Sequence, residues 1–155
     1  MKKRGFTMLE VLLVLLIIST LISLAIPNYL EIRKMGQAVR VITDFEAVRT
    51  AVAAYYAETG VFPPDYYPGG FPPELKPYLK KDFKFNLKPA INATYDWDNW
   101  VVDGKPKHPK TNILYGISVT TTDMALITKI KGLYNGPFQW SINQNYTFVM
   151  EYITK

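Results

Sequence analysis

The sequence contains no cysteine, and this absence removes several classes of protein at once. It excludes a disulfide framework, thiol catalysis and zinc sites built on cysteine. The chain also has a single histidine, His108, which lies between prolines in the run KPKHPK. With no second histidine, His108 has no partner for a zinc site or a nucleophile–base pair. Because no glycine-rich phosphate loop is present either, we expect a protein that is not an enzyme.

The chain also has little net charge once residues 1–4 are set aside. The formal net charge is +5, but Lys2, Lys3 and Arg4 supply three of the 18 basic side chains. The remaining 15 basic and 13 acidic side chains leave a surplus of only two positive charges. A global affinity for nucleic acid does not follow from so small a surplus.

What the sequence does contain is one long apolar stretch, which covers residues 6–26. Its only charged side chain is that of Glu10, and beyond Glu10 its polar interruptions are Ser19, Thr20 and Ser23. About twenty apolar residues are enough for a helix to cross a hydrocarbon core of ~30 Å. The hydroxyl groups can bond to carbonyl groups of their own helix. The stretch predicts a single-pass membrane helix, and the basic residues before it predict a cytoplasmic N-terminus.

Two other interpretations of this stretch compete with a functional one. A secretory signal peptide has an apolar region of only ~7–15 residues before small residues at a cleavage site, and the run LAIP is a poor site. A plain membrane anchor leaves Glu10 unexplained, because a carboxylate in the bilayer costs roughly 2.5–3.5 kcal/mol on insertion scales. Glu10 lies one turn inside the membrane, so it either serves a function or snorkels toward water. The chemistry of this residue alone leaves both interpretations open.

The residues around Glu10 carry a more specific pattern. The segment GFTMLE at residues 5–10 follows a short basic leader and precedes an apolar helix that reaches Pro27. It resembles the N-terminal signal of type IV pilins and type II secretion pseudopilins, over roughly the first quarter of the chain. The resemblance implies that a prepilin peptidase cleaves between Gly5 and Phe6 and methylates the new amino group of Phe6. It also implies a leader of residues 1–5 and a transmembrane helix of residues 6–26.

The same resemblance implies roles in filament assembly for Glu10 and Pro27. In the family, the glutamate is thought to meet the amino terminus of a neighbouring subunit. Such a pair attracts strongly in a packed, low-dielectric core, where either charge alone is costly. Glu10 also lies four residues from Phe6, so it can instead neutralise the amino group of its own chain.

The implied partners are the prepilin peptidase, other pilin or pseudopilin subunits, an assembly platform of the inner membrane and the lipid bilayer itself. The implied location is the inner membrane and then an extracytoplasmic filament. Many major type IV pilins close their C-terminal region with a disulfide. The absence of cysteine therefore favours a pseudopilin or a minor pilin.

Beyond the apolar stretch, residues 27–59 keep a helical period. Pro27 removes one backbone donor, so we expect it to bend or locally open the helix. Gly60, followed by Pro63 and Pro64, predicts the end of the helix. The expected buried stripe comprises Met35, Ala38, Ile42, Phe45, Val48, Val52 and Tyr55. The expected solvated face comprises Arg40, Asp44, Arg49 and Glu58.

Residues 60–155 predict an extracytoplasmic globular head. A short helical turn is expected from Pro73, and a second helix is expected to be capped by Asp123. Aromatic or alternating segments predict strands within residues 94–102, 113–120, 138–142 and 146–152, the last two as a hairpin. An antiparallel sheet that packs on the amphipathic half of the long helix buries both apolar faces. The predicted fold class is therefore α+β, which is also the fold that the pilin resemblance implies.

Two features of the head raise binding hypotheses. Asp96, Asp98 and Asp103 offer oxygen ligands of the kind that calcium prefers, but their spacing matches no EF-hand and a polar turn explains them as well. We expect no other cofactor. From Lys76 to Lys110 the chain carries eight basic residues, interleaved with Tyr78, Phe83, Phe85 and Tyr95. This region binds DNA or another anionic surface if its cations share one face, and is a solvated loop if they do not.

Overall fold

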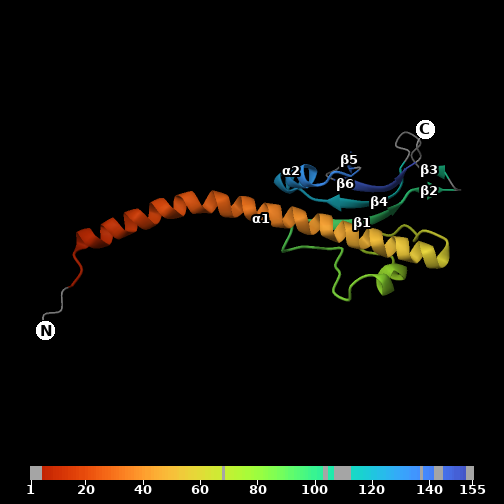
Figure 1. Cartoon of the computed structure of the whole chain (residues 1–155), viewed down its shortest axis with the longest axis horizontal. Helices are drawn as coiled ribbons and strands as arrows, with labels where there is room; N and C mark the ends of the chain where they lie inside the picture. Colours follow the sequence, from red (N-terminus) through yellow and green to blue (C-terminus); the bar gives the residue numbers. More distant parts are fainter. Residues whose placement is uncertain are drawn as a thin grey trace.

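The fold is dominated by one long helix. The computed structural model describes residues 5–67, 69–102, 105–106, 113–136, 138–141 and 145–152. Helix α1 (Met8–Thr59) has 52 residues, which correspond to about 78 Å at 1.5 Å per residue. Figure 1 shows its first half projecting away from the rest of the molecule and its second half lying along the head. The helices expected over residues 6–26 and 27–59 thus form one continuous helix.

The sequence predicted that the long helix ends at Gly60 and that it bends or opens at Pro27. Gly60 has a left-handed backbone with φ of 74°, and its N–H donates to the Tyr56 carbonyl at 2.8 Å. Glycine adopts this conformation without a steric penalty, so the predicted helix end is confirmed. Pro27 lies inside the continuous helix, so a local opening is not seen. Figure 1 shows a gentle curve, the milder of the two predicted effects.

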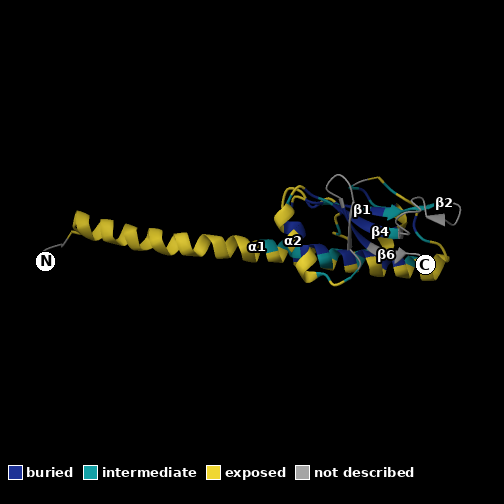
Figure 2. Ribbon diagram, turned by 90° about the horizontal axis from the view of Figure 1, so that it is seen from above, coloured by how far each residue is buried: buried dark blue, intermediate teal, exposed yellow. Residues whose placement is uncertain are grey.

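The burial of α1 divides the helix into two halves. All residues of α1 up to Arg33 are exposed, and Figure 2 shows this half in yellow with no other element beside it. The predicted stripe is largely confirmed in the second half, except that Met35 is 47% exposed. The buried residues of α1 are Ala38, Val41, Phe45, Val48, Ala51 and Val52.

One residue of the predicted solvated face is placed differently. The Asp44 side chain is only 15% exposed, and its carboxylate accepts a hydrogen bond from the Tyr95 hydroxyl at 3.0 Å. Tyr95 is buried in the core, so its hydroxyl needs an acceptor that a nearby helix can supply. The expectation of a fully solvated Asp44 was therefore wrong, because helical period alone does not reveal a partner on another element.

The head contains a four-stranded antiparallel sheet. Its strands are β1 (Thr94–Asn99), β4 (Ile113–Thr120), β5 (Phe138–Ser141) and β6 (Asn145–Tyr152), in the spatial order β1-β4-β6-β5. A separate two-stranded pair joins β2 (Val101–Val102) to β3 (Lys105–Pro106). The predicted hairpin of β5 and β6 is confirmed, and the single strand expected within residues 94–102 is divided into β1 and β2.

Two short helices complete the head. The predicted helical turn is η1 (Pro73–Tyr78), a 3₁₀ helix with proline at its start. The second predicted helix is α2 (Met124–Leu133), and the Asp123 carboxylate accepts a hydrogen bond from the Leu126 N–H at 3.1 Å. This bond satisfies one of the free donors at the start of α2, so the predicted cap is confirmed.

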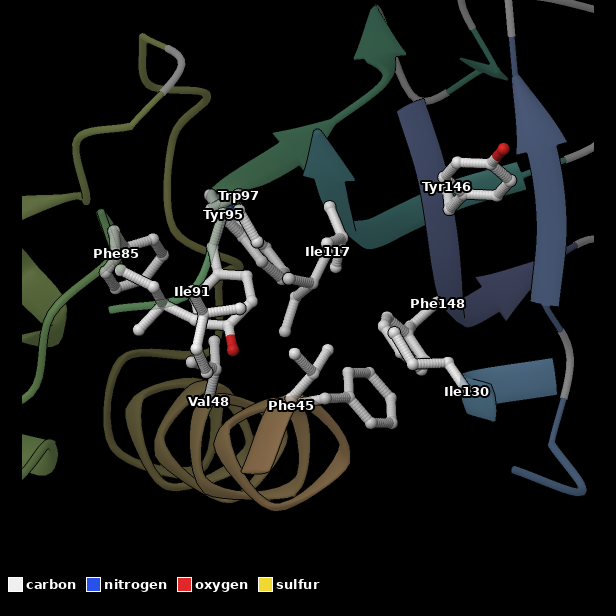
Figure 3. Close-up of a cluster of buried hydrophobic side chains, with 14 of the residues drawn as sticks. Phe45, Val48, Phe85, Ile91, Tyr95, Trp97, Ile117, Ile130, Tyr146 and Phe148 are labelled. Carbon is white, nitrogen blue, oxygen red and sulfur yellow. The ribbon is translucent and has the colours of Figure 1, made fainter. Parts of the chain in front are cut away.

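The core lies between α1 and the sheet. Figure 3 shows side chains from α1, from the loop before β1, from strands of the sheet and from α2, which belong to one buried cluster. Trp97, which is fully buried, donates its indole N–H to the Pro63 carbonyl at 3.2 Å and so ties the loop after α1 to the sheet. The architecture is α+β, as predicted.

The central strand β4 departs from a simple half-buried pattern. Ile117 and Val119 face the core, but Ser118 on the opposite face is also buried, at 5% exposure. The Ser118 hydroxyl donates to the Asp98 carboxylate and lies 3.0 Å from the Thr147 hydroxyl. Asp98 of β1 and Thr147 of β6 therefore cover Ser118 from both sides, and the outer face of β4 is closed at this point.

Candidate functional site

The peptide bond between Gly5 and Phe6 lies in an exposed, non-helical segment. Gly5, Phe6 and Thr7 precede the first turn of α1, and Phe6 is 87% exposed. A Cβ added at Gly5 would meet no atom within 4 Å. Nothing in the described fold therefore requires glycine here, so any requirement for it must come from an external binding partner. Residues 1–4 of the predicted leader lie outside the described residues.

Glu10 closes a capping box with Thr7 at the start of α1. The Glu10 carboxylate oxygen Oε2 accepts the Thr7 backbone N–H at 2.7 Å and the Thr7 hydroxyl at 2.9 Å. In return the Glu10 N–H donates to the Thr7 hydroxyl at 3.3 Å. The capping box fixes the Glu10 side chain toward the N-terminal end of the helix rather than out from its side.

Thr7 is the residue of this site that the sequence reasoning missed. The spacing Thr-x-x-Glu before an apolar run is the signature of a capping box, so the signal was present in the sequence. The pair gives Glu10 a local structural role in the uncleaved chain. It also brings the carboxylate to within one residue of Phe6, where cleavage would create a new ammonium group.

The polar residues of the apolar stretch satisfy their own hydrogen bonds. The hydroxyl groups of Ser19, Thr20 and Ser23 each donate to the carbonyl three residues before them, at 2.8 Å. The predicted bonding within the helix is therefore confirmed, and these groups need no water. By length and composition, α1 is able to cross a membrane.

The predicted calcium ligands are only partly within the described chain. Asp96 and Asp98 lie on the outer face of β1, whereas Asp103 lies outside the described residues. Burial and the charges of Asp98 and Asp65 raise the pKa of Asp96 to about 7. Burial likewise raises the pKa of Asp98 to about 6, although its bond from Ser118 opposes this. No group of three or more metal-binding side chains gathers among the described residues, so calcium stays a prediction.

Only some of the basic residues between Lys76 and Lys110 are shown to lie close together. Lys76, Lys80 and Lys81 line one open hollow of about 670 Å³ beside Phe71 and Phe83. The region was predicted to have aromatic rings interleaved with its cations. Two of those rings, Phe85 and Tyr95, are buried in the core and cannot stack on a ligand. The stretch of residues 107–110 lies outside the described residues.

Comparison with known proteins finds one family model and several relatives that each match part of the chain. Residues 1–26 match the family model described as the prokaryotic N-terminal methylation motif. The type II secretion system core protein G of Vibrio cholerae is 34% identical over 62 residues, which are 40% of this chain and 42% of the relative. The same protein of Escherichia coli is 32% identical over 62 residues, 40% of this chain and 43% of the relative.

A pilin is similar to the same degree. The type IV major pilin protein PilE of Neisseria gonorrhoeae is 32% identical over 63 residues, which are 41% of this chain and 38% of the pilin. The chain thus spans less than half the length of each of these relatives. No solved structure matches the chain significantly. The similarity drawn from residues 5–10 is confirmed by these comparisons.

Proposed function

We propose that this chain, which carries the N-terminal segment of the type IV pilin and pseudopilin family, is a pilin-like structural subunit rather than an enzyme. It is processed by a prepilin peptidase and assembled into a type IV pilus or a type II secretion pseudopilus. The observation that carries the proposal is the methylation motif over residues 1–26, which includes the start of an apolar helix that continues into the core of the head. The absence of cysteine favours a pseudopilin or a minor pilin.

The exposed half of α1 supports this proposal on physical grounds. An apolar surface of this extent is stable only in lipid or against other apolar helices. In the membrane the helix is surrounded by lipid, and in a filament it is surrounded by the helices of other subunits. The N-terminus faces the cytoplasm by the positive-inside bias of Lys2, Lys3 and Arg4, and the head lies on the outer side.

Glu10 is proposed to bind the methylated amino group of Phe6, either of its own chain or of a neighbouring subunit. Both described hydrogen bonds of its carboxylate go to the oxygen Oε2, and both come from Thr7. The second carboxylate oxygen makes no hydrogen bond within the described residues. This oxygen is the acceptor that a neighbouring ammonium group would use.

The processing step is tested by co-expression with a prepilin peptidase and mass spectrometry of the membrane-extracted protein. The expected product begins at Phe6 and is heavier by one methyl group than the unmodified product. Gly5→Val is the control, because the described fold has room for its side chain and only the peptidase is expected to reject it. A native chain that keeps residues 1–5 in working assemblies would overturn the proposal.

The assembly step is tested with Glu10→Ala. The processed variant is expected to stay in the membrane and to be depleted from filaments. The matched control is Glu46→Ala, which removes an exposed carboxylate of the same helix, one that lies outside the apolar stretch. Normal incorporation of processed Glu10→Ala would rule out the docking role while leaving the processing step intact.

A second candidate function is binding of DNA or another anionic surface by the head. The observation that favours it is the hollow in which Lys76, Lys80 and Lys81 lie together. Such binding is electrostatic, so it is expected at low salt and falls steeply as salt rises. Absence of binding at low salt, or binding unchanged by substitution of these lysines with glutamine, would exclude it.

A further inference from the structure

Three segments of the chain meet at the end of the head that lies nearest the apolar stretch. Figure 1 shows α2 at this end, beside the point where α1 enters the head. The Lys129 ammonium of α2 lies 2.6 Å from the Glu31 carboxylate of α1, and Lys34 forms a second ion pair with Asp123. The loop before β1 joins them, because the Gln37 side chain donates to the Ala90 carbonyl at 3.4 Å.

The charges at this end are predominantly positive. The basic side chains are Arg33, Lys34, Lys88 and Lys129, which we name the basic collar. The acidic side chains are Glu31 and Asp123, so four cations face two carboxylates and a surplus of two positive charges remains. The hydrogen bond and the charge of Lys129 lower the pKa of Glu31, so the Glu31 carboxylate is ionised at neutral pH.

The surplus is carried by two cations that are exposed. Arg33 and Lys88 are both exposed, and neither forms an ion pair within the described part of the chain. The other basic residue of this part of α2, Lys131, lies 5.8 Å from the centre of the Tyr146 ring and is turned toward the sheet. Arg33 and Lys88 are therefore the side chains available to an external anion.

The length of the apolar stretch fixes how far these cations lie from the membrane. If the hydrocarbon core ends at Ile26, Arg33 lies about 10 Å further along the helix at 1.5 Å per residue. The headgroup layer is about 5–7.5 Å thick on each side of the bilayer. Arg33 then lies within about 5 Å of the headgroups, which is less than the Debye length of ~8 Å at physiological salt. Lys88 lies two residues before Ala90, which meets α1 at Gln37, about 16 Å beyond Ile26. Lys88 is exposed, and its long flexible side chain can extend its ammonium group toward the headgroups.

We propose that the basic collar binds the phosphate groups of anionic phospholipids in the outer leaflet while the subunit resides in the membrane. The proposal rests on the proposed function, because it needs residues 6–26 to span the bilayer with the head outside. The guanidinium group of Arg33 can donate two parallel hydrogen bonds to one phosphate, and Lys88 supplies a second point charge. The two ion pairs hold α2 against α1, and the bond from Gln37 to Ala90 ties the loop that carries Lys88 to the same helix.

Such binding gives the waiting subunit a preferred lipid environment. Each cation near an anionic membrane surface contributes about fivefold to the affinity for that surface. Two free cations thus enrich anionic lipid around the base of the head, and the enrichment decreases as salt rises. Release of these contacts would be one of the steps by which the subunit leaves the bilayer.

The test uses the full chain reconstituted in nanodiscs of phosphatidylcholine and phosphatidylglycerol. Because the chain has no cysteine, Ala125→Cys gives a single labelling position on exposed surface near the collar. The label is quenched by phosphatidylglycerol or by phosphatidylcholine, each carrying the same nitroxide on its headgroup. The ratio of the two quenching efficiencies measures the local enrichment of the anionic lipid. We expect a ratio of several-fold at low salt and a ratio near one at high salt.

Two double variants decide the outcome. Arg33→Gln with Lys88→Gln is expected to bring the ratio near one. Arg40→Gln with Arg49→Gln removes the same charge from exposed positions of α1 that lie further from the membrane, and is expected to leave the ratio unchanged. A ratio of one for the inserted native chain, or equal losses in both double variants, would contradict lipid binding by the basic collar. Neither result would contradict the proposed membrane span. Failure of the chain to insert into the bilayer would overturn the proposed membrane span together with the collar.

Discussion

The ring of Phe45 on α1 is stacked against the ring of Phe148 on β6, with 4.6 Å between their centroids. Tyr134, which follows α2, meets both rings edge-on, at 5.5 and 4.9 Å. The three rings join the long helix, the sheet and the end of α2 in one contact. The helix with the apolar N-terminal half therefore also forms one wall of the head.

Phe45→Ala is expected to lower the free energy of unfolding of the head by about 3–5 kcal/mol, because a buried phenylalanine leaves a cavity when it is truncated. Denaturant unfolding of the detergent-solubilised chain, followed by near-ultraviolet circular dichroism, measures the change. Val39→Ala is the control on the same helix, since Val39 is 49% exposed, and its effect is expected to stay within about 0.5 kcal/mol. Similar losses in both variants would contradict the packing described.

Asp96 and Asp98 predict an unusual dependence of stability on pH. Their pKa values in the folded chain, about 7 and about 6, lie above the unfolded value of ~3.9. The folded state thus binds more protons, so the free energy of unfolding contributed by these groups is greatest below pH ~4 and is lost as the pH rises to about 7.

Asp96→Asn is expected to reduce this loss and to stabilise the protein at pH 7 by on the order of 1–2 kcal/mol, after allowance for solvent screening. Urea unfolding at a series of pH values between 4 and 8 measures the effect. The Asp82→Asn variant, which neutralises an exposed carboxylate, serves as the comparison. Parallel pH curves for the native chain and Asp96→Asn would show that Asp96 titrates normally.

The pKa of Asp123 is shifted in the opposite direction to those of Asp96 and Asp98. Burial opposes its ionisation, but hydrogen bonds from Lys34 and from the N–H groups of Leu126 and Ala125 outweigh burial and lower its pKa. Its contribution to stability is therefore present above the unfolded pKa of ~3.9 and is lost as the pH falls further. Asp123→Ala is expected to cost about 1–2 kcal/mol at neutral pH, because α2 loses its cap and Lys34 loses its partner.

Asp123→Asn separates these two contributions, since asparagine retains the cap and removes the charge. A smaller loss than in Asp123→Ala is expected by thermal unfolding at neutral pH. Equal losses in the two variants would mean that the ion pair, and not the cap, carries the effect.

The calcium hypothesis makes its own prediction. If Asp103 joins Asp96 and Asp98 at one ion, calcium at a hundred times its dissociation constant raises the free energy of unfolding by about 2.7 kcal/mol. Removal of calcium by a chelator is then expected to lower the melting temperature, and Asp103→Asn is expected to abolish the difference. A melting temperature that calcium does not change, or that magnesium raises equally, favours the polar turn instead.

The sequence predicted those features that repeat along the chain. The period of the apolar residues located the second half of α1, and the alternation of apolar residues located β4 and β6. The motif at residues 5–10 located the candidate processing site, because it is a local pattern that needs no fold. The helix end at Gly60 and the cap at Asp123 were predictable for the same reason.

Contacts between distant segments were not predictable in this way. The bond from Tyr95 to Asp44 joins residues 51 positions apart, and the bond from Ser118 to Asp98 joins neighbouring strands. Neither pairing leaves a signal in the local sequence, so Asp44 was assigned to solvent and the burial of Ser118 was not predicted. The burial that raises the pKa of Asp96 was missed for the same reason.

The continuity of α1 has a mechanical consequence. Ala38, Val48 and Val52 are fully or almost fully buried in the head, so the helix cannot be pulled from it without exposing apolar surface. No flexible linker lies between the two halves, because α1 runs unbroken from Met8 to Thr59. A force applied to the head is transmitted directly to the apolar shaft, and the molecule responds to it as one stiff body.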